Sequence, residues 1–202
     1  MHIAIARKPL YVVAWSSMST LSFVSQMIAH ISRISQVRRR QTPSHGGVKV
    51  FFDDGSYRSF DATLPAWREQ NEAEWEAEYA RRCTWTEEFR LPTSVADPQE
   101  ILERCEAQLG SWPYPKMQLL RMWRRIRLGI PFKENADEVV CSEAQSRIVW
   151  PRGEILAFFG KTKHDYVAPV HVLYYCRQRG YPVRRRRNGD IVFDQWAHLM
   201  KL

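Results

Sequence analysis

The spacing of apolar and polar residues divides the chain into short strands and amphipathic helices. Residues 2–6 and 10–15 are β-branched and aromatic runs typical of buried strands. Apolar residues then recur every three to four positions over residues 19–34, which predicts an amphipathic helix. Pro43 prevents further helix, because proline cannot donate the backbone hydrogen bond that a helix interior needs.

A β-hairpin is predicted over residues 44–62, because two strand-like runs flank the turn sequence Asp-Asp-Gly. It carries His45 at its beginning and Asp61 near its end. We therefore expect these two side chains to lie near adjoining strand ends. The Gly-Gly pair that follows His45 indicates a strand entrance where backbone comes close to another element or to a substrate.

The rest of the chain alternates between helical and strand patterns. Helices are predicted over the acidic segment 67–80, from the N-cap Asp97 to Gly110, from Pro115 to Gly129, over 141–150, and from Pro169 to about Arg179. A strand is predicted over 83–91, and a basic hairpin with an Asn-Gly turn over 183–193. Together these elements predict an α+β fold in which a small antiparallel sheet packs against helices.

Length and composition predict one domain spanning residues 1–202. The 202 residues are 45% hydrophobic and include 8 Trp, which fills one core but hardly two independent ones. The four cysteines are far apart and form no Cys-x-x-Cys pair, so neither a zinc knuckle nor a disulfide scaffold is indicated. We expect no metal and no cofactor.

The net charge of +8 favours polyanionic partners such as nucleic acid, anionic lipid or a cell-wall polymer. Two groups of arginines could contact nucleic acid: Arg121, Arg124, Arg125 and Arg127 around Trp123, and Arg184 to Arg187. No helix-turn-helix, zinc-finger spacing or RNA-recognition motif accompanies them. A solvated basic face explains them as well, and nucleic-acid binding ranks third among the functions that we consider.

The N-terminal region imitates a signal peptide, with Arg7 and Lys8 before the apolar run 9–15. Serines and a threonine interrupt this run over residues 16–20, long before the roughly 18 apolar residues that a membrane span needs. We therefore expect a protein that is made in the cytoplasm, has no cleaved signal and has no transmembrane segment.

Cys141 is the strongest candidate for chemistry, because it lies where a helix is predicted to begin. Helix N-terminal amides and a nearby imidazolium both favour the reactive thiolate form of a cysteine. His45 is distant in sequence, so a functional pair requires the 44–62 hairpin to pack against the helix that begins at Cys141. Asp61 could orient the imidazole. The alternative for Cys141 is a place in the core, since a lone cysteine is more often buried than nucleophilic.

Several stretches in order along the chain resemble the permuted papain-like hydrolases related to NlpC-type cell-wall peptidases, in which the histidine strand precedes the cysteine helix. The stretches are the apolar helix 19–34, Ser44-His45 leading a strand, Phe60-Asp61-Ala62, Trp112-Pro113-Tyr114, Val140-Cys141-Ser142-Glu143 and Ala168-Pro169-Val170. The chain lacks the glycine-aspartate turn that family members often carry after the first strand.

The resemblance implies a circularly permuted papain-like fold with Cys141 as nucleophile, His45 as base and Asp61 as the third residue, whose identity and position vary in the family. It further implies cleavage of an amide or peptide bond, with peptidoglycan as the first substrate class to test. The backbone N–H of Cys141 or a neighbour could stabilise the oxyanion, and the Tyr114 hydroxyl is a candidate oxyanion or substrate contact. An alternative is a structural protein of a bacteriophage tail or baseplate, assembled with other virion proteins, that retains this scaffold with or without activity.

Overall fold

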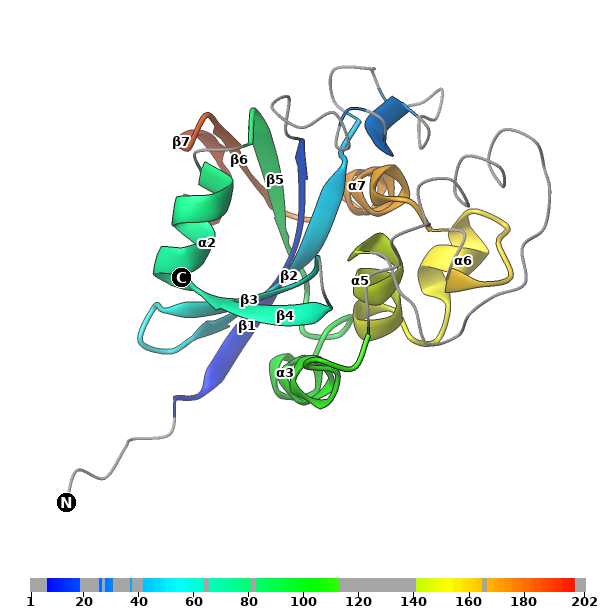
Figure 1. The fold of residues 1–202 in the computed structure, drawn as a ribbon, viewed down its shortest axis with the longest axis horizontal. Coiled ribbons are helices and arrows are strands. Elements are labelled where there is room, and N and C mark those ends of the chain that lie inside the picture. The colour runs from blue at the N-terminus through cyan, green and yellow to red at the C-terminus, as the bar shows by residue number, and fades with distance from the viewer. Residues whose placement is uncertain are drawn as a thin grey trace.

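The protein is built on a seven-stranded antiparallel sheet that carries helices on both faces (Figure 1). The computed structural model describes residues 7–18, 26, 28–30, 37, 42–63, 66–80, 83–112, 141–164 and 167–198. The strand order is β4-β3-β2-β1-β5-β6-β7. The predicted α+β architecture is therefore confirmed, although the sheet is larger than the small one that we expected.

Strands from distant parts of the sequence meet in this sheet. They are β1 (Pro9–Met18), β2 (His45–Phe52), β3 (Tyr57–Ala62), β4 (Trp67–Asn71), β5 (Trp85–Arg90), β6 (Val183–Arg187) and β7 (Asp190–Asp194). The two predicted hairpins are confirmed as β2–β3 and β6–β7. In the second hairpin Asn188 and Gly189 have φ angles of 51° and 94°, as the two central residues of a tight hairpin turn require.

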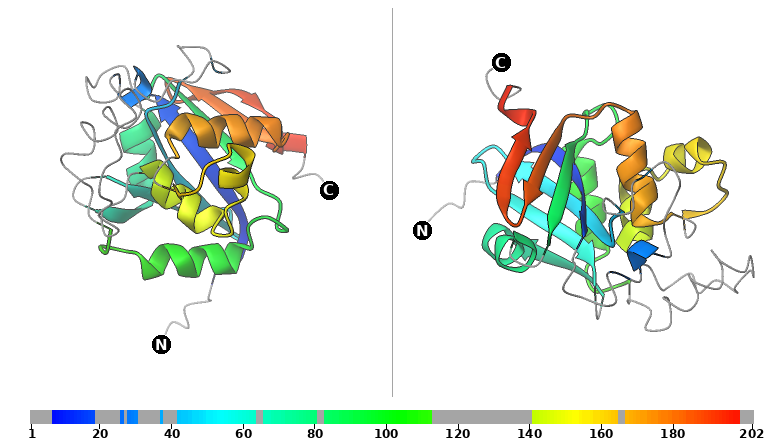
Figure 2. Two further views of the ribbon diagram at one scale, coloured as in Figure 1. Left: turned by 90° about the vertical axis from the view of Figure 1, so that its right-hand side faces the viewer. Right: turned by 90° about the horizontal axis from the view of Figure 1, so that it is seen from above.

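The helices divide between the two faces of the sheet, as Figures 1 and 2 show. One face carries α3 (Pro98–Ala107), α5 (Cys141–Val149), α6 (Glu154–Phe158) and α7 (Pro169–Gln178). The other carries α2 (Glu72–Trp75), which continues as the π-helical segment η2 (Glu76–Ala80). A short 3-10 helix, η4 (Trp196–His198), follows the last strand.

Three helix predictions are confirmed, and their ends follow from the sequence. Asp97 is the N-cap of α3, where its side chain accepts the backbone N–H of Glu100 at 2.9 Å and Pro98 is the first helical residue. Helix α5 ends at Val149, before Pro151, and α7 begins at Pro169. No helix or strand is predicted from the sequence for the segment that includes α6.

Alternation along the central strand β1 separates two hydrophobic cores. Val12 and Ala14 lie in the larger core, together with buried residues of α3, α5 and α7. Tyr11, Val13 and Trp15 lie in the smaller one, together with residues of α2 and η2. Burial of both faces of β1 explains why its sequence reads as a continuous apolar run rather than an alternating one.

The predicted helix over 67–80 is wrong in its first part. Residues 67–71 form β4, which pairs with β3, and the helix begins only at Glu72. Pairing with β3 decides the conformation here, since it buries Trp67 against Phe60 and allows the Trp67 indole N–H to donate to the Cys105 carbonyl oxygen at 3.1 Å. Sheet pairing thus overrides the helical character of the acidic segment.

Several predictions lie outside the described residues. They are the strand at 2–6, most of the helix at 19–34, the helix between Pro115 and Gly129, and the Tyr114 contact. Within 19–34 the described residues 26 and 28–30 are helical.

Candidate functional site

His45 is the first residue of β2, the strand next to the centre of the sheet. Its side chain is 17% exposed, so the imidazole lies at the boundary between core and solvent. The edge of the Trp15 ring packs against it at a centroid distance of 5.4 Å, and the Tyr79 ring stacks on it at 5.7 Å, nearly parallel. These two aromatic contacts restrict the directions in which the imidazole can turn.

The Gly-Gly pair after His45 provides the close approach that the sequence indicated. A Cβ atom on Gly47 would lie 2.3 Å from the Phe60 carbonyl oxygen and 2.8 Å from the Trp15 ring. On Gly46 it would lie 2.8 Å from the Trp15 carbonyl oxygen and 3.0 Å from the side chain of Gln145. Both positions therefore exclude larger residues for steric reasons.

Asp61 lies beside His45, as predicted from the two ends of the hairpin. Gly47 on β2 pairs with Asp61 on β3, and the Nε2 atom of His45 is 2.9 Å from the Oδ2 atom of Asp61. The Asp61 side chain has no exposed surface. Burial alone would raise the pKa of Asp61, but the hydrogen bond and charge of His45, together with Arg68, hold it below its ordinary value.

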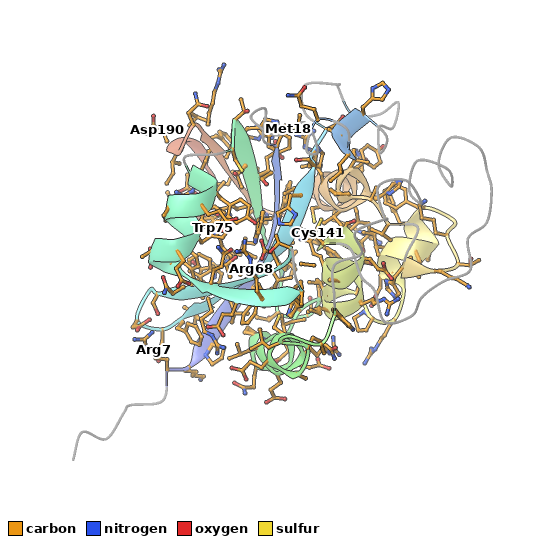
Figure 3. The ribbon with its side chains drawn as sticks, in the orientation of Figure 1. Arg7, Met18, Arg68, Trp75, Cys141 and Asp190 are labelled. Carbon is orange, nitrogen blue, oxygen red and sulfur yellow. The ribbon has the colours of Figure 1, made fainter. Side chains whose placement is uncertain are left out.

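Cys141 is the first residue of α5 and is buried, with 3% of its surface exposed. Helix α5 packs against β2 and β3, and the Cys141 side chain interacts with His45 of β2. In Figure 3 the labelled Cys141 lies on α5 and the labelled Arg68 on β4. The structure therefore brings Cys141 to the His45–Asp61 pair of the β2–β3 hairpin, which is far from it in the sequence.

The pKa of His45 reports the interaction between these three residues. Burial by itself would lower this pKa, because it disfavours the charged imidazolium. The charge of Cys141, the hydrogen bond with Asp61 and a hydrogen bond with Cys141 outweigh burial and raise the pKa of His45 to about 10. An imidazole in this environment holds its proton at neutral pH.

Two polar side chains on α5 fix the helix in place. The Ser142 hydroxyl donates to the carbonyl oxygen of Val167 at 2.7 Å, just before α7. The Gln145 side-chain amide donates to the carbonyl oxygens of Gly47 at 2.6 Å and Trp15 at 3.2 Å. The cysteine helix is therefore tied both to α7 and to the strand that begins at His45.

Sequence reasoning missed Arg68, Tyr79 and Gln145. The Nε atom of Arg68 donates to Oδ1 of Asp61 at 2.9 Å, and the Tyr79 hydroxyl donates to Oδ2. Arg68 and Tyr79 lie in the acidic segment that was read as one helix, which concealed the inward direction of Arg68. The glycines after His45 were the available signal that a side chain such as Gln145 approaches the strand.

The other three cysteines, Cys83, Cys105 and Cys176, are buried. Burial raises the pKa of Cys83 to about 11 and also raises the pKa values of Cys105 and Cys176. Each of these thiols therefore stays protonated at neutral pH. All four cysteines are free, without disulfides.

Three of the arginines in the C-terminal hairpin have carboxylate partners. Arg184 pairs with Asp194 at 3.0 Å, Arg185 with Glu87 at 3.1 Å and Arg186 with Glu76 at 3.0 Å. These three side chains thus take part in ion pairs within the fold, and Glu87 is shared with Arg177. The arginines between positions 121 and 127 lie outside the described residues.

Over the described residues, no three His, Cys, Asp or Glu side chains are placed together so that they could hold a metal ion. Nor do these residues include a helix with the length and apolar character needed to cross a membrane.

Comparison of the chain with models of known protein families and with characterised proteins found no match.

Proposed function

We propose that the protein is a thiol hydrolase in which Cys141 is the nucleophile, His45 the general base and acid, and Asp61 the residue that orients His45. The observation that carries this proposal is the position of His45, which interacts with the Cys141 thiol and with the Asp61 carboxylate at once. A nucleophile, a base and an orienting carboxylate in contact are the arrangement that covalent acyl transfer requires.

The two ring nitrogens of His45 would have different partners in this mechanism. Nε2 faces Asp61 at 2.9 Å, which leaves Nδ1 as the nitrogen for the Cys141 thiol. A protonated His45 favours the Cys141 thiolate, which attacks the carbonyl carbon of an amide and forms a tetrahedral intermediate. His45 then gives its proton to the leaving nitrogen, and an acyl-enzyme forms. Attack by water, with His45 as base, releases the acid and restores the thiol.

The start of α5 supplies the oxyanion contact in this proposal. The first backbone N–H groups of a helix have no partner within the helix and point out of its N-terminal end. The N–H of Cys141 or of a neighbour would donate to the oxyanion. The negative charge is further favoured there by the helix dipole.

The order of the elements supports a circularly permuted papain-like fold as part of the same proposal. The strand that begins with His45 precedes the helix that begins with Cys141 along the chain. Ser142, which belongs to one of the stretches that carry the resemblance, donates to Val167, the residue directly before the stretch Ala168-Pro169-Val170. We propose peptidoglycan stem peptides as the first substrate class, since a +8 chain is attracted to anionic envelopes.

Digestion of purified peptidoglycan tests this proposal. The wild type, Cys141→Ala and His45→Ala are incubated with it, and released peptides are identified by mass spectrometry. Cys176→Ala is the matched control, because it removes a thiol from the core on α7. We expect release by the wild type and by the control, and a loss of at least about a thousandfold in the two site variants. Equal inertness of the wild type and Cys141→Ala would contradict the proposal.

A further inference from the structure

The Asp61 carboxylate is held by three side chains from three different elements. His45 of β2 and the Tyr79 hydroxyl of η2 bond to Oδ2, while the Nε atom of Arg68 on β4 donates to Oδ1 at 2.9 Å. A second nitrogen of Arg68 lies 3.5 Å from Oδ2. A buried carboxylate is stable only if it is hydrogen-bonded and paired, and these partners serve both oxygens.

Arg68 is itself fixed by a second carboxylate. Its outer guanidinium nitrogen lies 2.9 and 3.0 Å from the two oxygens of Glu78, and Gln70 donates to Glu78 at 2.7 Å. The planar guanidinium thus bridges Asp61 and Glu78 in one orientation. Asp61 therefore pairs with the Arg68 guanidinium, whose position is fixed by Glu78 of η2.

Tyr79 contacts both members of the His45–Asp61 pair. Its hydroxyl bonds to Asp61, and its ring lies parallel to the His45 ring, with an interplanar angle of 7°. Glu78 and Tyr79 are neighbours in the π-helical segment η2. Such π-helical turns occur frequently at functional sites.

From this network we infer that Arg68 and Tyr79 are positioning residues, which act through Asp61 to keep the His45 ring directed at Cys141. The inference rests on the proposed function. Arg68 holds the carboxylate ionised and prevents it from rotating, and Tyr79 fixes the same carboxylate and the face of the imidazole. Without them, Asp61 would retain its bond to His45 but lose the contacts that define its direction.

Two measurements on the full chain test this inference. The first is the NMR signal of the His45 Nε2–H proton in protein labelled with ¹⁵N-histidine, since a hydrogen bond to Asp61 shifts this signal downfield. The second is the rate at which iodoacetamide alkylates Cys141 at pH 7, followed by mass spectrometry of the Cys141 peptide. The test variants are Tyr79→Phe, which keeps the ring, and Arg68→Gln. A third variant, Arg68→Lys, keeps the positive charge but lacks the planar guanidinium that bridges Asp61 and Glu78. Asp61→Asn gives the NMR signal and the alkylation rate that remain when the carboxylate itself is removed.

Arg58→Gln is the matched control, because Arg58 lies on β3 but pairs with Glu69 and Glu106. We expect Tyr79→Phe and Arg68→Gln to weaken or broaden the His45 signal and to slow alkylation about tenfold, the effect of losing one hydrogen bond to a charged group. Arg68→Lys should recover part of the rate, and Arg58→Gln should match the wild type.

Unchanged signals and rates in Tyr79→Phe and Arg68→Gln, with only a lower melting temperature, would overturn the inference and leave the two residues a structural role. This result is distinguishable from failure of the proposed function. If the wild type cleaves no substrate, the His45 signal still decides whether Arg68 and Tyr79 position the ring. If the wild type is active and the two variants match it, only the positioning role is lost.

Discussion

The side-chain amide nitrogen of Gln145 lies 2.6 Å from the carbonyl oxygen of Gly47. Gln145 is one helical turn after Cys141 on α5, and Gly47 is two residues after His45 on β2. The same nitrogen also reaches the carbonyl oxygen of Trp15 on β1 at 3.2 Å. One amide group therefore joins the helix of the proposed nucleophile to the strand of the proposed base.

Replacing Gln145 by leucine should lower the free energy of unfolding by about 1–3 kcal/mol, because the two strand carbonyls lose a buried donor. Urea denaturation followed by circular dichroism measures this change. Gln99→Leu is the control, since Gln99 is exposed on α3 and bonds only to Glu103 on the same helix among the described contacts. Equal stability of the two variants would show that the tie has no energetic role.

Gly47→Ala should destabilise the protein by more than about 3 kcal/mol, because the new Cβ would lie 2.3 Å from backbone that belongs to the adjacent strand. Gly55→Ala gives the comparison. Gly55 has a φ of 83° and open space around it, so this variant should cost only the strain of a positive φ, about 1 kcal/mol. Thermal unfolding measures both. A Gly47→Ala protein as stable as Gly55→Ala would contradict the packing described here.

Local sequence signals predict part of this fold, whereas contacts between distant elements cannot be predicted from them. The Asp-Asp-Gly and Asn-Gly turns, the Asp97 cap and the prolines at helix ends are local signals, and the elements that they predict are confirmed. The pairing of His45 with Asp61 was also accessible, because both lie on one hairpin. Local patterns could not place Arg68, whose inward direction depends on β4 pairing with β3. Tyr79 and Gln145 likewise reach the site only through packing between distant elements.

Lys49 and Glu88 form a buried ion pair beside the smaller core, and removal of one partner leaves the other as an uncompensated buried charge. Both side chains are 1% exposed, and the Lys49 ammonium also lies 3.2 Å from the centre of the Trp75 ring. Glu88→Gln leaves the buried cation without its charged partner, so we expect a loss of about 3–5 kcal/mol. The double variant Lys49→Met/Glu88→Leu should recover most of it, as chemical denaturation can show. A double variant less stable than Glu88→Gln would be the opposite result.

The raised pKa of His45 predicts how stability depends on pH. Its folded pKa of about 10 exceeds the ordinary value of 6.5, so the stabilisation is complete below pH 6.5 and is lost as the pH rises through 10. Lys49 acts in the opposite direction, because burial lowers its pKa to about 8 and stability therefore increases between that pH and 10.5. The difference in the free energy of unfolding between the wild type and His45→Gln isolates the contribution of His45.

We expect the stability advantage of the wild type over His45→Gln to shrink steadily between pH 6.5 and 10. Urea unfolding at several pH values in this range measures it. An advantage that stays constant over the whole range would mean that His45 gains no proton affinity on folding.

The alkylation rate of Cys141 is the decisive measurement, because it reports the reactivity of this thiol and needs no knowledge of the substrate. If His45 and Cys141 form an activated pair, iodoacetamide at pH 7 alkylates Cys141 at least about ten times faster in the wild type than in His45→Ala, as followed by mass spectrometry of the Cys141 peptide. Equal rates in the wild type and His45→Ala would contradict the activation of Cys141 by His45.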